Sequence, residues 1–119
     1  MPCSVRLRLT DIFEAIDGIR TTVANVSFDQ YCQNRTVRRA VERELEIISE
    51  ASRHIPADLQ EAAPEVPWRE IAGIGNVLRH DYQRVADKIV WNVVELHVDP
   101  LRDAVVRLLA RLPDDDGAA

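Results

Sequence analysis

The sequence predicts an all-α protein folded as an antiparallel bundle of four to five helices. Apolar residues recur at three- and four-residue steps over most of the 119 residues, which is the period of an amphipathic helix. Glycine is scarce, at 4 residues, and there is little of the Asn-Gly and Asp-Gly chemistry that turns a β-hairpin. Hydrophobic residues make up 46% of the chain but aromatic ones only 5%, so the core must consist mainly of Leu, Ile, Val and Ala.

The first helix is predicted from about Leu9 to Val26, because its apolar residues form one stripe at helical spacing. Asp11 followed by Glu14 resembles a capping box near the start of this helix. Ser27 is then expected to cap a short second helix.

A second long helix is predicted from about Thr36 to His54, and Pro56 follows it as a stop. The polar connection that comes next is expected to be a loop with one helical turn between Ala57 and Ala62. A third helix is predicted to begin near Pro67, since proline suits a first helical turn.

Gly73 and Gly75 lie inside this third segment, and each costs about 1 kcal/mol relative to alanine in a helix. Glycines at such positions indicate either close packing of a neighbouring helix or a ligand near the backbone, and packing is the simpler interpretation. The Trp68 side chain before them is expected to lie in the core, as is that of Trp91 further along the chain.

The last helical segment is predicted to begin near Asp87 as its cap. Pro100 is expected to interrupt or restart it, with Asp99 as a second cap, and Pro113 to end it. Propensity alone would make its first half a strand, but the sequence offers no partner strand, so we predict helix for the β-branched residues Val90, Val93, Val94 and Val98.

These elements suit one domain over residues 1–113, followed by a short acidic tail at 114–119 that is expected to be disordered. No apolar run reaches the roughly 18 residues needed to span a membrane. The basic N-terminus is not followed by the long apolar stretch of a signal peptide, so a cytoplasmic location is expected.

The positions of cysteine and histidine bear on whether the protein binds a metal. Cys3 and Cys32 are far apart in sequence, and the three histidines are scattered, so no zinc-binding spacing occurs and we expect neither a metal nor a cofactor. His54 and His97 are interpreted as surface residues near helix ends.

The net charge of −5 argues against binding of nucleic acid by the whole surface. A helix would nevertheless gather Arg35, Arg38 and Arg39, together with Arg43, into one basic stripe. This stripe is a weak candidate for RNA binding. A solvated helix face with internal ion pairs is the favoured interpretation, because glutamates are interspersed.

The segment from Asn76 to Tyr82, with sequence NVLRHDY, carries most of the chemistry. On a helix Asn76 and His80 share one face, since they are four residues apart. His80 can exchange a proton near neutral pH, and Asn76 and Arg79 can hold a charged oxygen such as that of a phosphate. The alternative is a polar helix end that points into solvent, with Tyr82 covering part of the core.

Three stretches of this chain resemble the HepT-like toxins of the HEPN superfamily of small helical RNases. They are AVERELEIISEA over residues 40–51, VPWREIAGIGNVLRHDY over residues 66–82, and the pair Val90-Trp91. The family shows a similar rELEIIGEA run, a PW..I.G.RN...H.Y run and a tryptophan in the following helix. The resemblance covers nearly the whole chain.

The resemblance implies a helical bundle that forms a homodimer and cleaves RNA without a metal in a cleft between the subunits. It also implies a type II toxin–antitoxin pair, in which a minimal nucleotidyltransferase of the MntA type silences the toxin by transferring AMP to a tyrosine. Position by position, the motif histidine falls on His80, the motif tyrosine on Tyr82 and the asparagine on Asn76.

The motif arginine should stand five positions before His80, where this sequence has Gly75. Arg79 is the nearest substitute, because on a helix it points roughly the same way as position 75, one turn further along. Two functions therefore stay open: an RNase toxin with a catalytic set of His80, Asn76 and Arg79, or an RNase-inactive bundle that only binds its nucleotidyltransferase partner.

Overall fold

The computed structural model describes residues 4–80 and 82–113, and every regular element in these two ranges is a helix. The long helices are α1 (Val5–Val23), α3 (Arg35–Ser52), α7 (Gln83–Leu96) and α8 (Val98–Arg111). The short ones are α2 (Phe28–Gln33), α4 (Ala57–Glu61), α5 (Trp68–Ala72) and α6 (Ile74–His80). The predicted all-α class is confirmed, whereas the acidic tail predicted at 114–119 lies outside the described residues.

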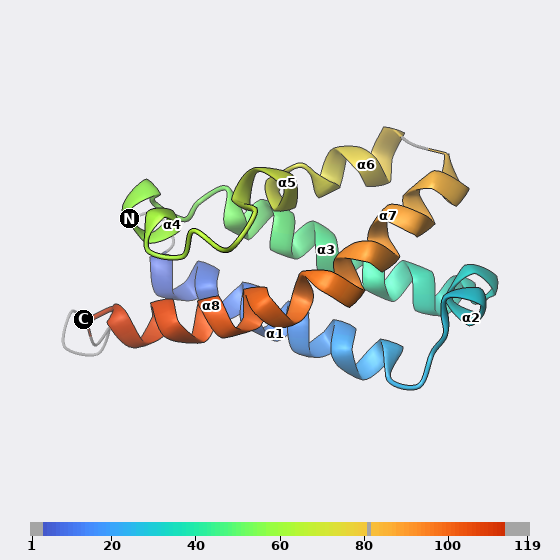
Figure 1. The fold of residues 1–119 in the computed structure, drawn as a ribbon, viewed down its shortest axis with the longest axis horizontal. Coiled ribbons are helices and arrows are strands. Elements are labelled where there is room, and N and C mark those ends of the chain that lie inside the picture. The colour runs from blue at the N-terminus through green and yellow to red at the C-terminus, as the bar shows by residue number, and fades with distance from the viewer. Residues whose placement is uncertain (1–3, 81, 114–119) are drawn as a thin grey trace.

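Helix α1 is the centre of an antiparallel bundle and packs along both α3 and α8 (Figure 1). The bundle is elongated, at 47 × 26 × 26 Å, and α8 ends beside the start of α1. Helix α6 lies against α3, and α7 runs back from the far end of α6 to join α8 (Figure 1). The α6–α7 connection is therefore a corner at the edge of the bundle.

The core is aliphatic, as the composition predicts. Its fully buried side chains come mainly from α1, α3 and α8, and they include Leu9, Ile12, Ile16, Ile19, Val41, Leu45, Ile48, Val105 and Leu108. Burial of this apolar area stabilises the bundle at roughly 25 cal/mol per Å².

The capping prediction for the first helix is wrong. Helix α1 begins four residues earlier than expected, at Val5, and Ser4 caps it by accepting a hydrogen bond from the Leu7 amide. Asp11 therefore lies inside the helix, where no free amide is left for it to cap. The cap predicted for α2 is confirmed, because Ser27 and Gln30 form a reciprocal capping box.

The third predicted segment is two helices rather than one. Helix α5 ends at Ala72, Gly73 is its C-cap, and α6 begins at Ile74. The Asn76 amide donates to the Gly73 carbonyl and not to that of Ala72, so the Ala72 carbonyl is free to accept from elsewhere.

The caps predicted for the last two helices are also wrong. Helix α7 starts at Gln83 with Tyr82 as its N-cap, so Asp87 lies in the second turn, buried at 4% exposure. Helix α8 starts at Val98 with His97 as its N-cap, which places Asp99 within its first turn. His97 is the single residue between α7 and α8, and the chain bends there (Figure 1). The valine-rich segment is helical, as predicted.

Both tryptophans pack inward. Trp68 is 9% exposed and its indole N–H donates to the carbonyls of Gln60 and Ala63, while Trp91 is half-buried and stacks on Tyr31 at a centroid distance of 5.2 Å. The Tyr31–Trp91 contact joins α2 to α7. Trp91 lies in the second half of α7, so this contact fixes the part of α7 beyond its midpoint against α2.

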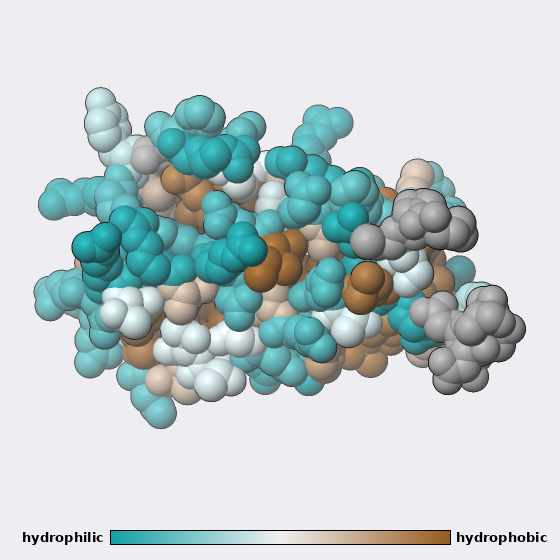
Figure 2. Space-filling model, turned by 180° about the vertical axis from the view of Figure 1, so that it is seen from behind, coloured by the Kyte–Doolittle hydropathy of each residue, from teal (hydrophilic) through white to brown (hydrophobic). Residues whose placement is uncertain are grey.

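Hydrophilic residues cover most of the face turned away from the view of Figure 1, and hydrophobic ones appear there as separate patches (Figure 2). Over the described ranges, none of the helices combines the length and the apolar character that a membrane span requires.

Candidate active site at the corner of helices α6 and α7

Two of the predicted site residues lie at the corner where α6 ends and α7 begins. His80 is the last residue of α6, and Tyr82 caps α7. The His80 side chain is exposed, and Tyr82 projects into solvent with 87% of its surface exposed. Neither side chain hydrogen-bonds to another described residue, so both are accessible to a ligand; Asp81 between them lies outside the described residues.

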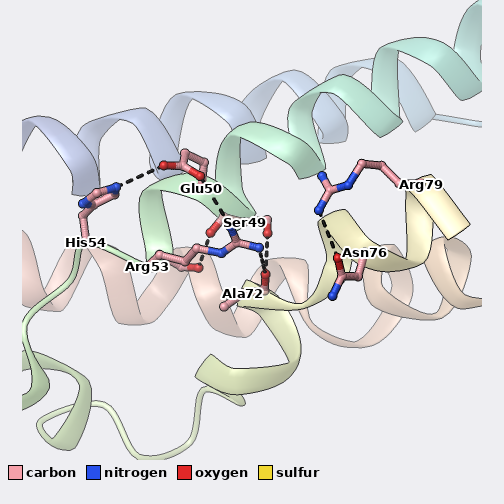
Figure 3. Close-up of polar contacts among 8 residues, drawn as sticks. Ser49, Glu50, Arg53, His54, Ala72, Asn76 and Arg79 are labelled. Carbon is pink, nitrogen blue, oxygen red and sulfur yellow. Dashed lines mark hydrogen bonds and ion pairs between the residues drawn. The ribbon is translucent and has the colours of Figure 1, made fainter.

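Asn76 and Arg79 form a polar pair on α6. The Nη2 atom of Arg79 donates a 3.0 Å hydrogen bond to Oδ1 of Asn76 (Figure 3). Asn76 in turn is four residues before His80, so it lies on the same side of the short helix. The guanidinium, the amide and the imidazole are thus carried by two turns of one helix.

The guanidinium of Arg79 folds back over Gly75. A Cβ atom built on Gly75 would lie 3.1 Å from Nη1 of Arg79 and 3.5 Å from Oγ of Ser49 on α3. The place that a side chain at position 75 would take is therefore already occupied by the Arg79 guanidinium and bounded by α3. Gly75 itself is buried, which agrees with the close packing expected of this glycine.

The carbonyl of Ala72, freed by the break between α5 and α6, is bound from α3. The Ser49 hydroxyl donates to it at 2.7 Å and Nη2 of Arg53 at 3.0 Å (Figure 3). Ser49 is 2% exposed, so this hydroxyl has no contact with bulk water and depends on the carbonyl for its hydrogen bond. These two bonds fix the end of α5 against the C-terminal end of α3.

Charges on α3 extend this polar region away from the corner. His54 and Glu50 form a 3.1 Å hydrogen bond, and this contact lowers the pKa of the Glu50 carboxyl (Figure 3). Arg53 also lies 3.6 Å from Glu50. His54 is exposed near the end of α3, where the sequence predicted it, and lies at the opposite side of the close-up from Arg79 (Figure 3).

The first residue of α7 is tied to α3 by a polar bridge. The Gln83 amide nitrogen donates to Oε2 of Glu42 at 3.3 Å and to Oδ1 of Asp87 at 2.6 Å. Since Tyr82 directly precedes Gln83, this bridge restrains the corner. Sequence reasoning missed Gln83 and Ser49. The sequence marked Ser49 only as a polar residue next to the buried stripe of α3. It gave no indication of the role of Gln83, because the partner of Gln83 on α3 lies 41 positions away.

The arginine stripe predicted on α3 is not one continuous basic surface. Arg38 turns back to donate to the Cys32 carbonyl at 2.7 Å, and Arg39 pairs with Glu42 at 3.0 Å. Arg35 is exposed at the first position of α3. Arg43 lies 3.9 Å from Glu46, so three of the four arginines of the stripe are engaged by neighbouring groups.

An open groove with a volume of about 710 Å³ separates α5 and α6 from α7. Its walls are mostly apolar, and Val77 on α6 faces Val85 and Ile89 on α7 across it. Val85 and Ile89 are 47% and 36% exposed, respectively. Within residues 4–80 and 82–113, His, Cys, Asp and Glu side chains do not gather in groups of three or more that could hold a metal ion.

Sequence comparison places the chain in a known family. The model of the family described as "Ribonuclease HepT-like" matches residues 12–108, and the chain belongs to that family. The match includes all of the helices that build the corner. The resemblance drawn from the motif residues is therefore confirmed at the level of the family.

Individual relatives agree. "Putative RNase MJ1380" of Methanocaldococcus jannaschii is 35% identical over 101 residues, which cover 85% of this chain and 93% of that protein. "Probable ribonuclease HepT" of Thermococcus cleftensis is 36% identical over 100 residues, or 84% of this chain and 91% of the relative. "Putative RNase TTE0752" of Caldanaerobacter subterraneus subsp. tengcongensis is 31% identical over 103 residues, or 87% and 92%. No solved structure matches the chain significantly.

Proposed function

We propose that this protein is a metal-independent endoribonuclease whose catalytic set is His80, Asn76 and Arg79. The observation that carries the proposal is the Arg79–Asn76 pair, held within one turn of an exposed imidazole in a chain of the HepT-like ribonuclease family. A guanidinium and an amide offer donors to a phosphate, and the imidazole can move protons beside it.

The chemistry requires two proton transfers. The 2′-hydroxyl of RNA attacks the adjacent phosphorus while a base removes its proton, and an acid protonates the leaving 5′-oxygen. His80 suits either role, because an imidazole can both accept and donate a proton near neutral pH. Arg79 offsets the negative charge that develops on the phosphorane oxygens.

A homodimer supplies both proton-transfer groups. One α6 end carries one imidazole, so two copies of His80 at a shared cleft divide the roles of base and acid. The apolar groove beside α6, with its exposed Val85 and Ile89, supports a subunit interface close to the corner. Sedimentation equilibrium tests this step, and a monomer at assay concentration contradicts it.

Tyr82 is the proposed acceptor of AMP from an MntA-type nucleotidyltransferase, which makes the protein the toxin of a type II pair. Its support is the contrast between the two tyrosines: Tyr82 is 87% exposed, while Tyr31 is completely buried. A transferase can reach the first hydroxyl and not the second. A bulky, charged AMP group at the corner would block RNA from His80.

The decisive experiment measures cleavage of a fluorescently labelled RNA by the purified protein in EDTA. We expect His80→Ala to lose on the order of 10²- to 10⁴-fold in rate, the usual range for a general acid–base group. His54→Ala is the matched control and should cleave normally, because His54 is an exposed histidine that lies away from the corner. Equal rates for wild type and His80→Ala would exclude the proposed mechanism.

Modification is tested by incubating the protein with a minimal nucleotidyltransferase and ATP, followed by mass spectrometry. We expect addition of AMP to wild type and to Tyr31→Phe, and none to Tyr82→Phe. Modification of the Tyr82→Phe variant would place the acceptor elsewhere.

The alternative is an RNase-inactive bundle that binds its nucleotidyltransferase partner, and Gly75 in place of the motif arginine is the observation that favours it. The two functions differ in one result. A protein that is modified on Tyr82 but neither cleaves RNA nor slows growth when its expression is induced is the binding module.

A further inference from the structure

We propose that Gly75 is a positioning residue: its lack of a side chain leaves a seat beside α3 in which Asn76 holds the guanidinium of Arg79. The inference rests on the proposed function in one respect, because it assigns Arg79 the role of the phosphate-binding cation. It goes beyond that function by giving the glycine a task of its own, where the motif alone indicates only a missing arginine.

The seat is defined by contacts on three sides. Nη1 of Arg79 lies 3.1 Å and Nη2 3.6 Å from the point where a Cβ of residue 75 would stand. Asn76 holds Nη2 through the 3.0 Å hydrogen bond, and the Ser49 hydroxyl closes the seat from α3 at 3.5 Å from the same point.

Even a methyl group at position 75 would disturb this arrangement. A separation of 3.1 Å is shorter than an ordinary contact between a methyl carbon and a nitrogen, so one of the two must move. Ser49 cannot make room, because it is buried and its hydroxyl is bonded to the Ala72 carbonyl at 2.7 Å. The end of the long arginine side chain is the mobile partner, and a shift of a few tenths of an ångström would strain its hydrogen bond to Asn76.

Helix propensity makes the inference testable. Glycine is a poor helix former and alanine the best, so Gly75→Ala should keep or raise the melting temperature if only the backbone matters. If Gly75 positions Arg79, the same substitution should lower the rate of RNA cleavage. Stability and cleavage should therefore change in different directions, which a purely structural role of Gly75 would not produce.

The experiment compares Gly75→Ala with Gly73→Ala. Gly73 lies two residues earlier, and a Cβ there would meet only backbone oxygens at 3.4 and 3.5 Å, which are ordinary contacts. We expect Gly75→Ala to melt no lower than wild type yet to lose on the order of 10- to 100-fold in kcat for RNA cleavage, as expected for a misplaced catalytic group. Gly73→Ala should keep the wild-type kcat. Wild-type kcat in Gly75→Ala would overturn the inference.

A second readout does not depend on cleavage. The side-chain amide signals of Asn76 and the guanidinium signals of Arg79 can be followed by ¹⁵N NMR in the same variants. We expect both sets to shift in Gly75→Ala and to stay in place in Gly73→Ala. If wild type cleaves no RNA, the proposed function fails, but the NMR comparison still tests whether the seat over Gly75 exists. Unchanged signals of Asn76 and Arg79 in Gly75→Ala would refute the seat.

Discussion

Asn76 and Arg79 are joined by a 3.0 Å hydrogen bond between side chains that lie one turn apart on the short helix α6. The bond restrains a long, flexible cation near an exposed histidine, and it leaves the remaining guanidinium donors available. A restrained cation loses less conformational entropy when it binds a phosphate than a free one does. This pair is the basis of the predictions on activity.

Asn76→Asp should slow RNA cleavage although it hardly changes the shape of the side chain. A carboxylate beside the guanidinium neutralises the cation and competes with the phosphate for it. We expect RNA cleavage to fall on the order of tenfold or more, the range found when one charge-stabilising donor is lost. The melting temperature should stay the same or rise. Cleavage at the wild-type rate would remove Arg79 from the mechanism.

An arginine at position 75 should compensate for the loss of Arg79. Arg79→Ala empties the seat over Gly75, so Gly75→Arg in that background can occupy the same space. We expect the double variant to cleave RNA faster than Arg79→Ala alone. Arg69→Ala, which removes an exposed arginine from α5, serves as the control and should be unaffected. A double variant as slow as Arg79→Ala would mean that the two positions are not equivalent.

Tyr31→Phe should leave the protein as stable as wild type or make it more stable by roughly 1 kcal/mol. The Tyr31 hydroxyl is buried and has no hydrogen-bond partner among the described residues, so the side chain carries a desolvation cost without compensation. The free energy of unfolding can be measured in urea. A loss of more than about 1 kcal/mol would reveal a partner for this hydroxyl.

The same tyrosine should make the protein less stable in alkali. Burial raises the pKa of the Tyr31 hydroxyl, and the nearby carboxylates of Asp87 and Glu42 raise it further. In the unfolded chain the phenol ionises near pH 10, while in the folded state it stays protonated, so the unfolded state is favoured as pH rises above about 10. Unfolding free energies measured from pH 8 to 11 should fall more steeply for wild type than for Tyr31→Phe. Cys32 is present in both proteins, so its own titration does not affect the comparison. Parallel curves would disprove the assignment.

Gln83→Ala should destabilise the corner by about 1–3 kcal/mol, because the buried Asp87 carboxylate loses its donor. The cost should be smaller when Asp87 is already asparagine, since a neutral amide is less costly to leave unpaired. A double-mutant cycle in urea measures this coupling. Additive effects would show that the two side chains act independently.

The sequence by itself determined the helical class, the aliphatic core and the spacing that brings Asn76 and His80 to one side of a helix. These features depend on interactions between residues three or four positions apart, which a linear pattern contains. The cap of α2 at Ser27 is of the same local kind, and its prediction is confirmed.

Only the tertiary structure decided that Asp87 is buried and where the Arg79 guanidinium lies. The pattern placed a cap at Asp87, but Asp87 is buried in α7, where it accepts a hydrogen bond from Gln83. The start of α1 is a local feature, since Ser4 accepts from the Leu7 amide, and the pattern that placed its cap at Asp11 missed it. The break at Gly73 and the seat over Gly75 both involve Ser49 of α3, at least 23 positions earlier in the chain. Contacts over such distances arise from helix packing, and no local periodicity encodes them.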